Sequence, residues 1–141
     1  MRIFLDANIL FSASKSAGAV RRLVALLLEE QHELWADAFV VEEARRNLTL
    51  KFPAAIPELE VLLGSLQLAP TATRAELPAE LLLLLPEKDR PVLAAAMRTG
   101  CDTLMTGDRA HFGALYGRTL GGVVICSPQS LAERALGSLG K

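Results

Sequence analysis

A short apolar run near the start of the chain, Ile3-Phe4-Leu5, stops at an acid, Asp6. Apolar runs bounded by a turn are typical of buried strands, although periodicity alone does not exclude a helix. In open α/β sheets, ligands bind just beyond the carboxyl ends of the strands. Asp6 would lie at that edge. Desolvating its carboxylate there costs free energy unless a cation or hydrogen-bond donors stabilise the charge. The other interpretation is that Asp6 caps the next helix, which Asp does well.

Strand-like and helix-like segments alternate along the rest of the chain. Apolar residues at three- and four-residue steps predict an amphipathic helix over 19–30, and Asp37 is placed to cap another over 38–50. Further strands are predicted at 32–36, 66–68, 101–106 and 123–126, helices at 91–99 and 128–135, and a loop at 71–78. This alternation predicts an α/β fold with a mainly parallel central sheet and right-handed crossovers.

Length and composition limit the classes of protein that this chain can be. Its 141 residues suit one domain, so 1–141 is expected to form a single unit. A net charge of -1 gives no sequence-wide attraction to a polyanion, so nucleic acid would need a local basic patch. Cys101 and Cys126 have no CxxC spacing, which argues against a thiolate zinc site or a disulfide framework and favours a reduced, cytoplasmic setting. Asp6 interrupts any signal-peptide core, and Leu81–Leu85 is too short to span a membrane.

Acids follow several of the predicted elements at one edge of the sheet. Asp6 and Asp108 each follow a strand, and a parallel sheet brings both strand ends to the same edge. Asp89 begins the helix that leads into the later strand, and Glu43 follows a strand by about one to two helical turns. Two unit charges about 4 Å apart repel by about 4 kcal/mol at an effective dielectric of 20. A divalent hard cation with oxygen ligands, such as Mg²⁺, would remove this repulsion.

Such a cluster suits phosphodiester cleavage, but each acid also has an ordinary structural interpretation. Two metal ions can stabilise both the attacking and the leaving oxygen of a phosphodiester. Alternatively, Asp89 is a helix-start acid favoured by the dipole, and Asp108 belongs to a turn. Glu43 could equally be a surface charge beside Glu42. His111 is expected to be structural rather than a ligand. The convergence of the acids therefore carries the functional interpretation.

Three segments resemble the PIN domain, the metal-dependent ribonuclease fold that includes the VapC-type toxins of toxin–antitoxin pairs. They are FLDANIL, VVEEARRNL and EKDRPVLAAAMRTGCDTLMTGD, and the resemblance extends to the closing VVICSPQSLAERAL. The resemblance implies a three-layer α/β sandwich, in which helices flank the sheet. It also implies Mg²⁺ or Mn²⁺ and a metal-activated water that attacks RNA. Residues 50–85 match by length and helical character only.

The resemblance implies a role for each matching residue. Asp6 is similar to the family's first-strand metal ligand, Asp89 to its central ligand and Asp108 to the acid that closes the site. Glu43 resembles the helix acid and is preferred to Glu42 because Leu48 follows it at a family-like spacing. The supporting polar residues would be Asn8 and Thr106. The arginines expected to grip phosphates are Arg45, Arg46, Arg90 and Arg109.

Two other function classes stay open. A haloacid-dehalogenase-like phosphatase also places an Asp after the first strand, but a second Asp normally stands two residues on, where this chain has Asn8. A non-catalytic PIN-fold interaction protein is the other alternative, and the presence of all four acids speaks against it. The family resemblance further implies an RNA substrate, a cognate antitoxin and a homodimer, with no membrane partner.

Overall fold

A central sheet organises the computed structural model, which describes residues 1–70 and 77–136. Within these residues six strands lie in the order β3-β2-β1-β4-β6-β5. All neighbouring pairs are parallel except β5 and β6. The strands are β1 (Arg2–Leu5), β2 (Glu33–Asp37), β3 (Gln67–Ala69), β4 (Thr103–Met105), β5 (Thr119–Leu120) and β6 (Val123–Cys126). The predicted α/β fold with a mainly parallel sheet is confirmed.

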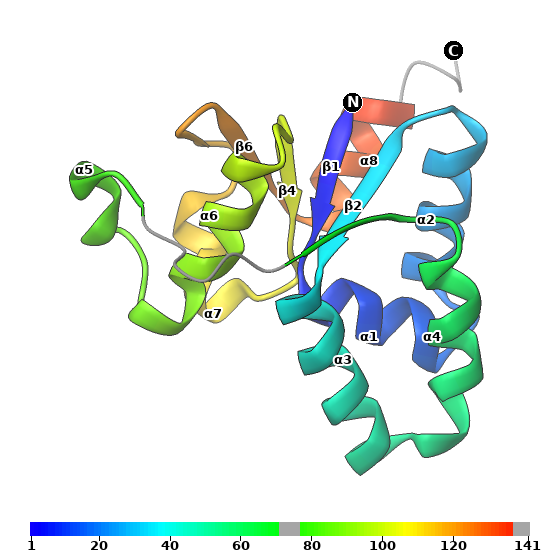
Figure 1. The fold of residues 1–141 in the computed structure, drawn as a ribbon. Helices are drawn as coiled ribbons and strands as arrows, with labels where there is room; N and C mark the ends of the chain where they lie inside the picture. The colour runs from blue at the N-terminus through cyan, green and yellow to red at the C-terminus, as the bar shows by residue number, and fades with distance from the viewer. Residues whose placement is uncertain (71–76, 137–141) are drawn as a thin grey trace.

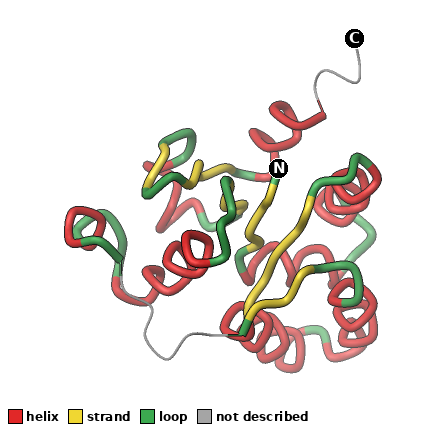
Figure 2. Tube along the Cα trace, turned by 45° about the horizontal axis from the view of Figure 1, so that its top comes forward, coloured by secondary structure: helices red, strands yellow, loops and turns green. Residues whose placement is uncertain are grey.

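Helices flank the sheet and connect its strands (Figure 1, Figure 2). Helix α2 packs against β2 and α8, and α8 also contacts β6, whereas α6 packs against β4 and β6. The helices are α1 (Ala7–Lys15), α2 (Ala19–Glu29), α3 (Ala38–Lys51), α4 (Ile56–Leu63), α5 (Ala79–Leu82), α6 (Arg90–Arg98), α7 (Arg109–Phe112) and α8 (Pro128–Leu136). Single 3-10 turns occupy Pro53–Ala55, Glu87–Asp89 and Gly113–Leu115. None of these helices is long and apolar enough to cross a bilayer.

The sequence-based element boundaries differ from the structure in a few places. The last strand matches its predicted range, and the strand expected at 101–106 is shortened to Thr103–Met105. The two-residue strand β5, paired antiparallel with β6, was not predicted, because two residues carry no periodicity. The loop expected at 71–78 is described only at 77 and 78, and the rest of it lies outside the described residues. The leucine-rich segment after it contains the single-turn helix α5.

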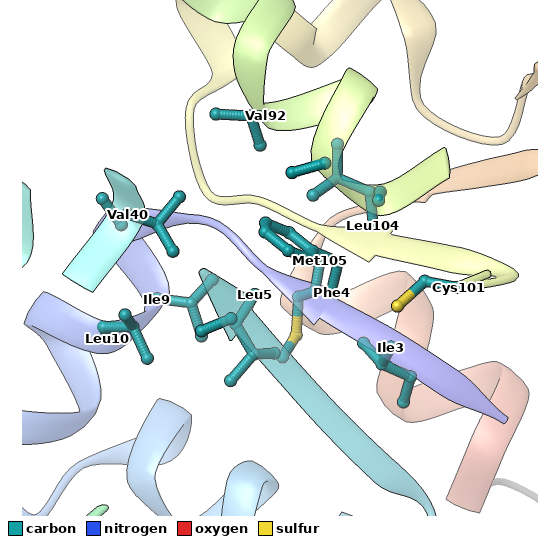
Figure 3. Packing of buried hydrophobic residues seen from close by; sticks show 14 of the residues in the cluster. Ile3, Phe4, Leu5, Ile9, Leu10, Val40, Val92, Cys101, Leu104 and Met105 are labelled. Carbon is teal, nitrogen blue, oxygen red and sulfur yellow. The ribbon is translucent and has the colours of Figure 1, made fainter. Parts of the chain in front are cut away.

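The hydrophobic core surrounds β1, the strand with sheet neighbours and helices on all sides. Ile3, Phe4 and Leu5 are fully buried, as are Leu104 and Met105 of the neighbouring strand β4 (Figure 3). A parallel strand that is covered on both faces reads as a continuous apolar run rather than an alternating one. This burial explains why the opening apolar run of the sequence predicts the centre of the sheet.

The order of the strands creates a switch point between β1 and β4. After β1 the chain adds β2 and then β3 on one side of it, and β4, β6 and β5 follow on the other side. The connections therefore leave β1 and β4 in opposite directions, which opens a crevice at their carboxyl ends. Figure 1 shows α1 and α7 beginning beyond that same end of the sheet. A binding site is expected there.

Candidate active site

Asp6 is the buried acid at the end of β1. Its backbone N–H donates to the carbonyl of Met105, so it extends the pairing of β1 with β4. It also caps α1, because its Oδ1 accepts from the backbone N–H of Ala7 at 2.7 Å. Oδ2 accepts from the hydroxyl of Thr106 at 2.8 Å and from the amide of Asn8 at 3.3 Å. The two interpretations of Asp6 as a cap and as a cleft acid are therefore compatible.

Burial makes the ionised form of Asp6 costly. Asp6 is only 5% exposed to solvent. The pKa of Asp6 is raised from 3.8 to about 6, mainly by desolvation. The hydrogen bonds from Thr106 and Ala7 oppose this rise, and the nearby carboxylates of Glu43 and Asp89 add to it. At neutral pH this position holds a negative charge that a cation would stabilise.

A network of short polar contacts ties the turn after β4 to the start of α1. Asn8 donates to the hydroxyl of Thr106 at 3.3 Å and accepts from the backbone N–H of Gly107 at 2.7 Å. The same hydroxyl accepts from the backbone N–H of Asp108 at 3.1 Å. The carbonyl of Thr106 accepts from the hydroxyl of Tyr116 at 2.8 Å. Asn8 and Thr106 thus contact the acid Asp6 and the turn that carries Asp108, and their supporting role stays a prediction.

The second group of potential ligands comes from the segments around α6 and α7. Asp89 ends a 3-10 turn just before α6, and Asp108 caps α7 by accepting from the backbone N–H of His111 at 3.2 Å. Nδ1 of His111 lies 3.0 Å from Oδ2 of Asp89 and 2.8 Å from Oδ2 of Asp108. Burial raises the pKa of Asp89, the imidazole lowers it, and the Asp108 carboxylate raises it. His111 therefore bridges the two acids.

The donor atoms of this group fit a divalent cation. One ligand atom from each of Asp89, Asp108 and His111 lies within 4.8 Å of the other two. Among the described residues, Oδ2 of Asp89 and Nδ1 of His111 are buried atoms whose contact lacks good hydrogen-bond geometry. A buried carboxylate oxygen without a satisfactory partner is rare and has a natural explanation in a bound ion. Carboxylate oxygens suit Mg²⁺ and Mn²⁺, and an imidazole suits other transition metals.

One cleft of about 350 Å³ is lined by most of the side chains described so far. All four predicted acids line it, together with Asn8, while Thr106 is fully buried next to Asp6. Glu43 reaches the cleft from the second turn of α3, whereas Glu42 is not among the lining residues. The complete lining is Asp6, Ala7, Asn8, Phe11, Phe39, Glu43, Asn47, Lys51, Lys88, Asp89, Val92, Asp108 and His111.

The structure places three basic side chains in the cleft to which the sequence assigned no functional role, His111, Lys51 and Lys88, and it places the predicted arginines outside the cleft lining. His111 was expected to be structural, and Lys51 and Lys88 carried no assignment, although the spacing of Lys51 eight residues after Glu43 was a signal. None of the four predicted phosphate-gripping arginines, Arg45, Arg46, Arg90 and Arg109, lines the cleft. Arg45 pairs with Glu60, and Arg90 donates to the carbonyl of Leu85 at 3.2 Å. Their role in substrate binding stays a prediction.

Known families and structures give independent information on this chain. A family model described as PIN domain matches residues 2–110. No curated protein sequence matches the chain.

Several solved structures have the same fold at low sequence identity. The crystal structure of VapBC2 from Rickettsia felis, bound to a DNA fragment from their promoter, matches with 17% identity and a TM-score of 0.66, over 90% of this chain and 98% of that one. VapC20 of Mycobacterium tuberculosis, a Sarcin-Ricin loop cleaving toxin, matches with 19% identity and a TM-score of 0.54, over 84% and 97%. PAE2754 from Pyrobaculum aerophilum matches with 18% identity and a TM-score of 0.60, over 95% and 88%. These likenesses confirm the fold.

Proposed function

The chain belongs to the PIN domain family, and from this premise we propose that it is a metal-dependent endoribonuclease that cleaves RNA phosphodiester bonds. The observation that carries the proposal is the convergence of four acids from separate parts of the chain on one cleft. A fold has no structural need to gather carboxylates, because unshielded like charges destabilise it. The buried Asp6, whose pKa is raised to about 6, is the costliest of them.

Each group of cleft residues would have a separate role in the reaction. Asp6, Asp89 and Asp108 would hold Mg²⁺ or Mn²⁺, and His111 stands beside the last two. When bound, the ion would supply charge stabilisation of the phosphate and an activated water. Glu43, which also lines the cleft, would orient a second ion or the attacking water and accept a proton from that water. The water oxygen would form its bond to phosphorus while the bond to the leaving ribose oxygen breaks, and solvent would give the departing oxygen a proton.

The supporting residues keep the acids in place during this reaction. Thr106 and Asn8 donate to Oδ2 of Asp6 and so fix the direction of its carboxylate. Lys51 and Lys88 are the cations in the cleft lining and are placed to attract the phosphates of an RNA chain. The sequence-based arginine candidates lie outside this lining, so the lysines are the first choice for phosphate contacts.

An RNA cleavage assay tests the proposal directly. The purified protein is incubated with single-stranded and structured RNAs in the presence of Mg²⁺, Mn²⁺ or EDTA. Asp89→Asn is the inactive variant, and Glu42→Gln is the matched control, since Glu42 is an exposed acid outside the cleft. We expect cleavage by the wild type and the control that needs metal and is lost in Asp89→Asn. Metal-dependent cleavage that persists in a folded Asp89→Asn protein would contradict the assignment.

A second outcome would favour the non-catalytic alternative. If the protein neither cleaves RNA nor binds metal in calorimetry, the non-catalytic PIN-fold interaction protein becomes the favoured interpretation. A covalent acyl-phosphate on Asp6 would instead favour the phosphatase alternative. Asn8, where a second catalytic Asp is needed for that chemistry, is already engaged with Thr106 and Gly107.

We further propose that the chain is the toxin of a type II toxin–antitoxin pair, acting in the cytoplasm as a homodimer. Two structural neighbours are VapBC structures, from Rickettsia felis and from nontypeable Haemophilus influenzae. The free, buried thiols of Cys101 and Cys126 suit a reducing compartment. Expression in a bacterial host should arrest growth, and Asp6→Asn should relieve the arrest. Normal growth with abundant soluble wild-type protein would count against the toxin role.

A further inference from the structure

The phenylalanines of this chain separate into two groups. Phe4 and Phe112 are fully buried in the core. The other three, Phe11, Phe39 and Phe52, all keep some exposure. Phe11 and Phe39 line the candidate cleft, and Phe52 lies against Phe11. The ring of Phe52, which is 43% exposed, lies edge-on to that of Phe11, with 5.8 Å between centroids and 62° between planes. Exposed aromatic rings gathered at one place are typical of a binding surface.

Lysines surround these rings. Nζ of Lys15 lies 5.5 Å from the ring centroids of both Phe11 and Phe52, and Nζ of Lys51 lies 5.9 Å from that of Phe11. Both lysines stand in the last turn of a helix, where a cation also interacts favourably with the helix dipole. The dipole accounts for a cation at each helix end but not for the exposed pair of rings between them.

The two helices that carry these residues connect them to the acids. On α3, Phe39, Glu43, Asn47 and Lys51 recur every four residues and all line the cleft. Residues four apart lie on one face of a helix, so this face changes from acid to cation along its length. The step from Glu43 to Lys51 covers eight residues, or about 12 Å of helix.

Helix α1 has the same arrangement. Asn8 and Phe11 line the cleft, and Lys15 follows one turn later beside the rings. Helices α1 and α3 pack against each other, and both begin at a strand end, at Asp6 and Asp37 (Figure 1). Phe11 and Lys51 therefore belong to the cleft lining that includes the acids, and Phe52 and Lys15 extend this surface through their contacts with Phe11.

Resting on the proposed nuclease function, we propose that Phe11, Phe52, Lys15 and Lys51 bind a single-stranded stretch of the RNA substrate next to the cleaved phosphate. We call these four residues the Phe–Lys platform. A base stacks against the partly exposed phenylalanine pair, and the two ammonium groups contact the flanking phosphates. Aromatic rings interleaved with cations are the combination that binds single strands without sequence readout. Bases inside a duplex are already stacked, so the platform selects unpaired RNA.

Binding is measured with protein that cannot cleave, so that affinity is read without turnover. Asp89→Asn is the background for every variant, and fluorescence anisotropy follows a labelled single-stranded RNA in Mg²⁺ buffer, beside the same RNA annealed to its complement. Phe11→Leu/Phe52→Leu keeps apolar volume but removes the rings, and Lys15→Gln/Lys51→Gln removes the charges. Arg22→Gln/Arg118→Gln is the matched control, because it removes two exposed cations outside the cleft. Thermal melts establish that each variant is folded.

The two kinds of variant should differ in salt dependence. The leucine pair should weaken single-stranded binding about tenfold and leave the slope of log affinity against log salt unchanged. The glutamine pair should weaken binding and reduce that slope by about 1.4, which is about 0.7 for each of two phosphate contacts. The arginine control should bind within about twofold of the background protein. Its affinity should depend on salt more steeply than that of the lysine variant.

Several results would overturn the platform. These are no measurable binding of single-stranded RNA, unchanged binding by the leucine pair, or an equal loss of duplex binding. Tighter binding of a poly-glutamate peptide, lost in the same variants, would assign the surface to an acidic protein segment instead. Cleavage by the protein with Asp89 intact is assayed separately. The platform can therefore fail while nuclease activity persists, and the nuclease proposal can fail while the platform holds.

Discussion

The hydroxyl of Thr106 donates a hydrogen bond of 2.8 Å to Oδ2 of Asp6, joining the end of β4 to the end of β1. The hydroxyl oxygen of Thr106 also accepts from the backbone N–H of Asp108 at 3.1 Å. One fully buried side chain therefore holds the first-strand acid and fixes the turn that carries another acid. The relative position of the two carboxylates depends on this hydroxyl more than on any direct contact between them.

Thr106→Val should lower metal affinity, because it keeps the shape of the side chain and removes the hydroxyl. Residues that orient metal ligands typically contribute about 10- to 100-fold in affinity, and a loss in this range is expected. Thr103→Val is the matched control: Thr103 is a buried threonine of β4, the strand that ends just before Thr106, and its hydroxyl donates to Asp102 at 2.7 Å. Isothermal titration with Mn²⁺ measures both variants. An equal loss of affinity in the two would contradict the positioning role.

Asp6→Asn should change how stability depends on pH. The pKa of Asp6 is raised from 3.8 in the unfolded chain to about 6 in the folded one, mainly by burial. The folded state therefore binds the proton more tightly, and the resulting stability is fully present below pH 3.8 and is lost as pH rises through about 6. Over this window the wild type should lose about 3 kcal/mol relative to Asp6→Asn.

Denaturant unfolding in EDTA at a series of pH values between 4 and 8 measures this difference. Taking the difference between the two proteins removes the contributions of Asp37 and Asp89, whose pKa values burial also raises. A difference that stays constant across the series would show that Asp6 is not the group responsible. Added Mg²⁺ should stabilise the wild type at pH 7 and have little effect on Asp6→Asn.

The sequence predicts the sheet and the meeting of the acids because both depend on backbone direction. Strands that run in parallel bring their ends to one edge, so Asp6 and Asp108 meet there whatever the packing details. The position of Glu43 near the same edge follows from helix geometry, because its separation from the N-cap Asp37 fixes how far along α3 it lies. Whether these acids catalyse a reaction stays a prediction.

The residues that the sequence did not reveal depend on side-chain partners. His111 lies between two carboxylates because the single turn α7 directs its Nδ1 there, which no periodicity indicates. The pairing of Arg45 with Glu60 of α4 likewise could not be read from the sequence, because it depends on how α3 and α4 pack. The Phe–Lys platform requires α1 and α3 to pack together, and only the folded chain brings Phe11 to Phe52.

Glu43→Gln should reduce RNA cleavage strongly, whereas Glu42→Gln should not. Glu43 lines the cleft, and its neighbour Glu42 is exposed outside it, so the pair differs in position and not in chemistry. Loss of a group that accepts a proton or orients the water typically costs 100-fold or more, so a loss of about 100-fold in cleavage rate is expected. Single-turnover assays at saturating Mg²⁺ measure the rate. Equal activity of the two variants would remove Glu43 from the mechanism.

His111→Gln should weaken Co²⁺ binding more than Mg²⁺ binding. Nδ1 of His111 belongs to the same compact group of ligand atoms as Asp89 and Asp108, and an imidazole nitrogen suits Co²⁺ better than Mg²⁺, which prefers oxygen. We therefore expect an about tenfold loss for Co²⁺ and a change within about twofold for Mg²⁺. Thermal-shift titrations with each ion compare the wild type and the variant.

The comparison of the two ions separates a ligand from a positioning residue. If His111 only holds Asp89 and Asp108 in place, at 3.0 Å and 2.8 Å from its Nδ1, the affinities for both ions should fall together, because both depend on those carboxylates. A selective loss for Co²⁺ requires a direct bond from the imidazole to the ion. An unchanged affinity for both ions would return His111 to the purely structural role that the sequence suggested.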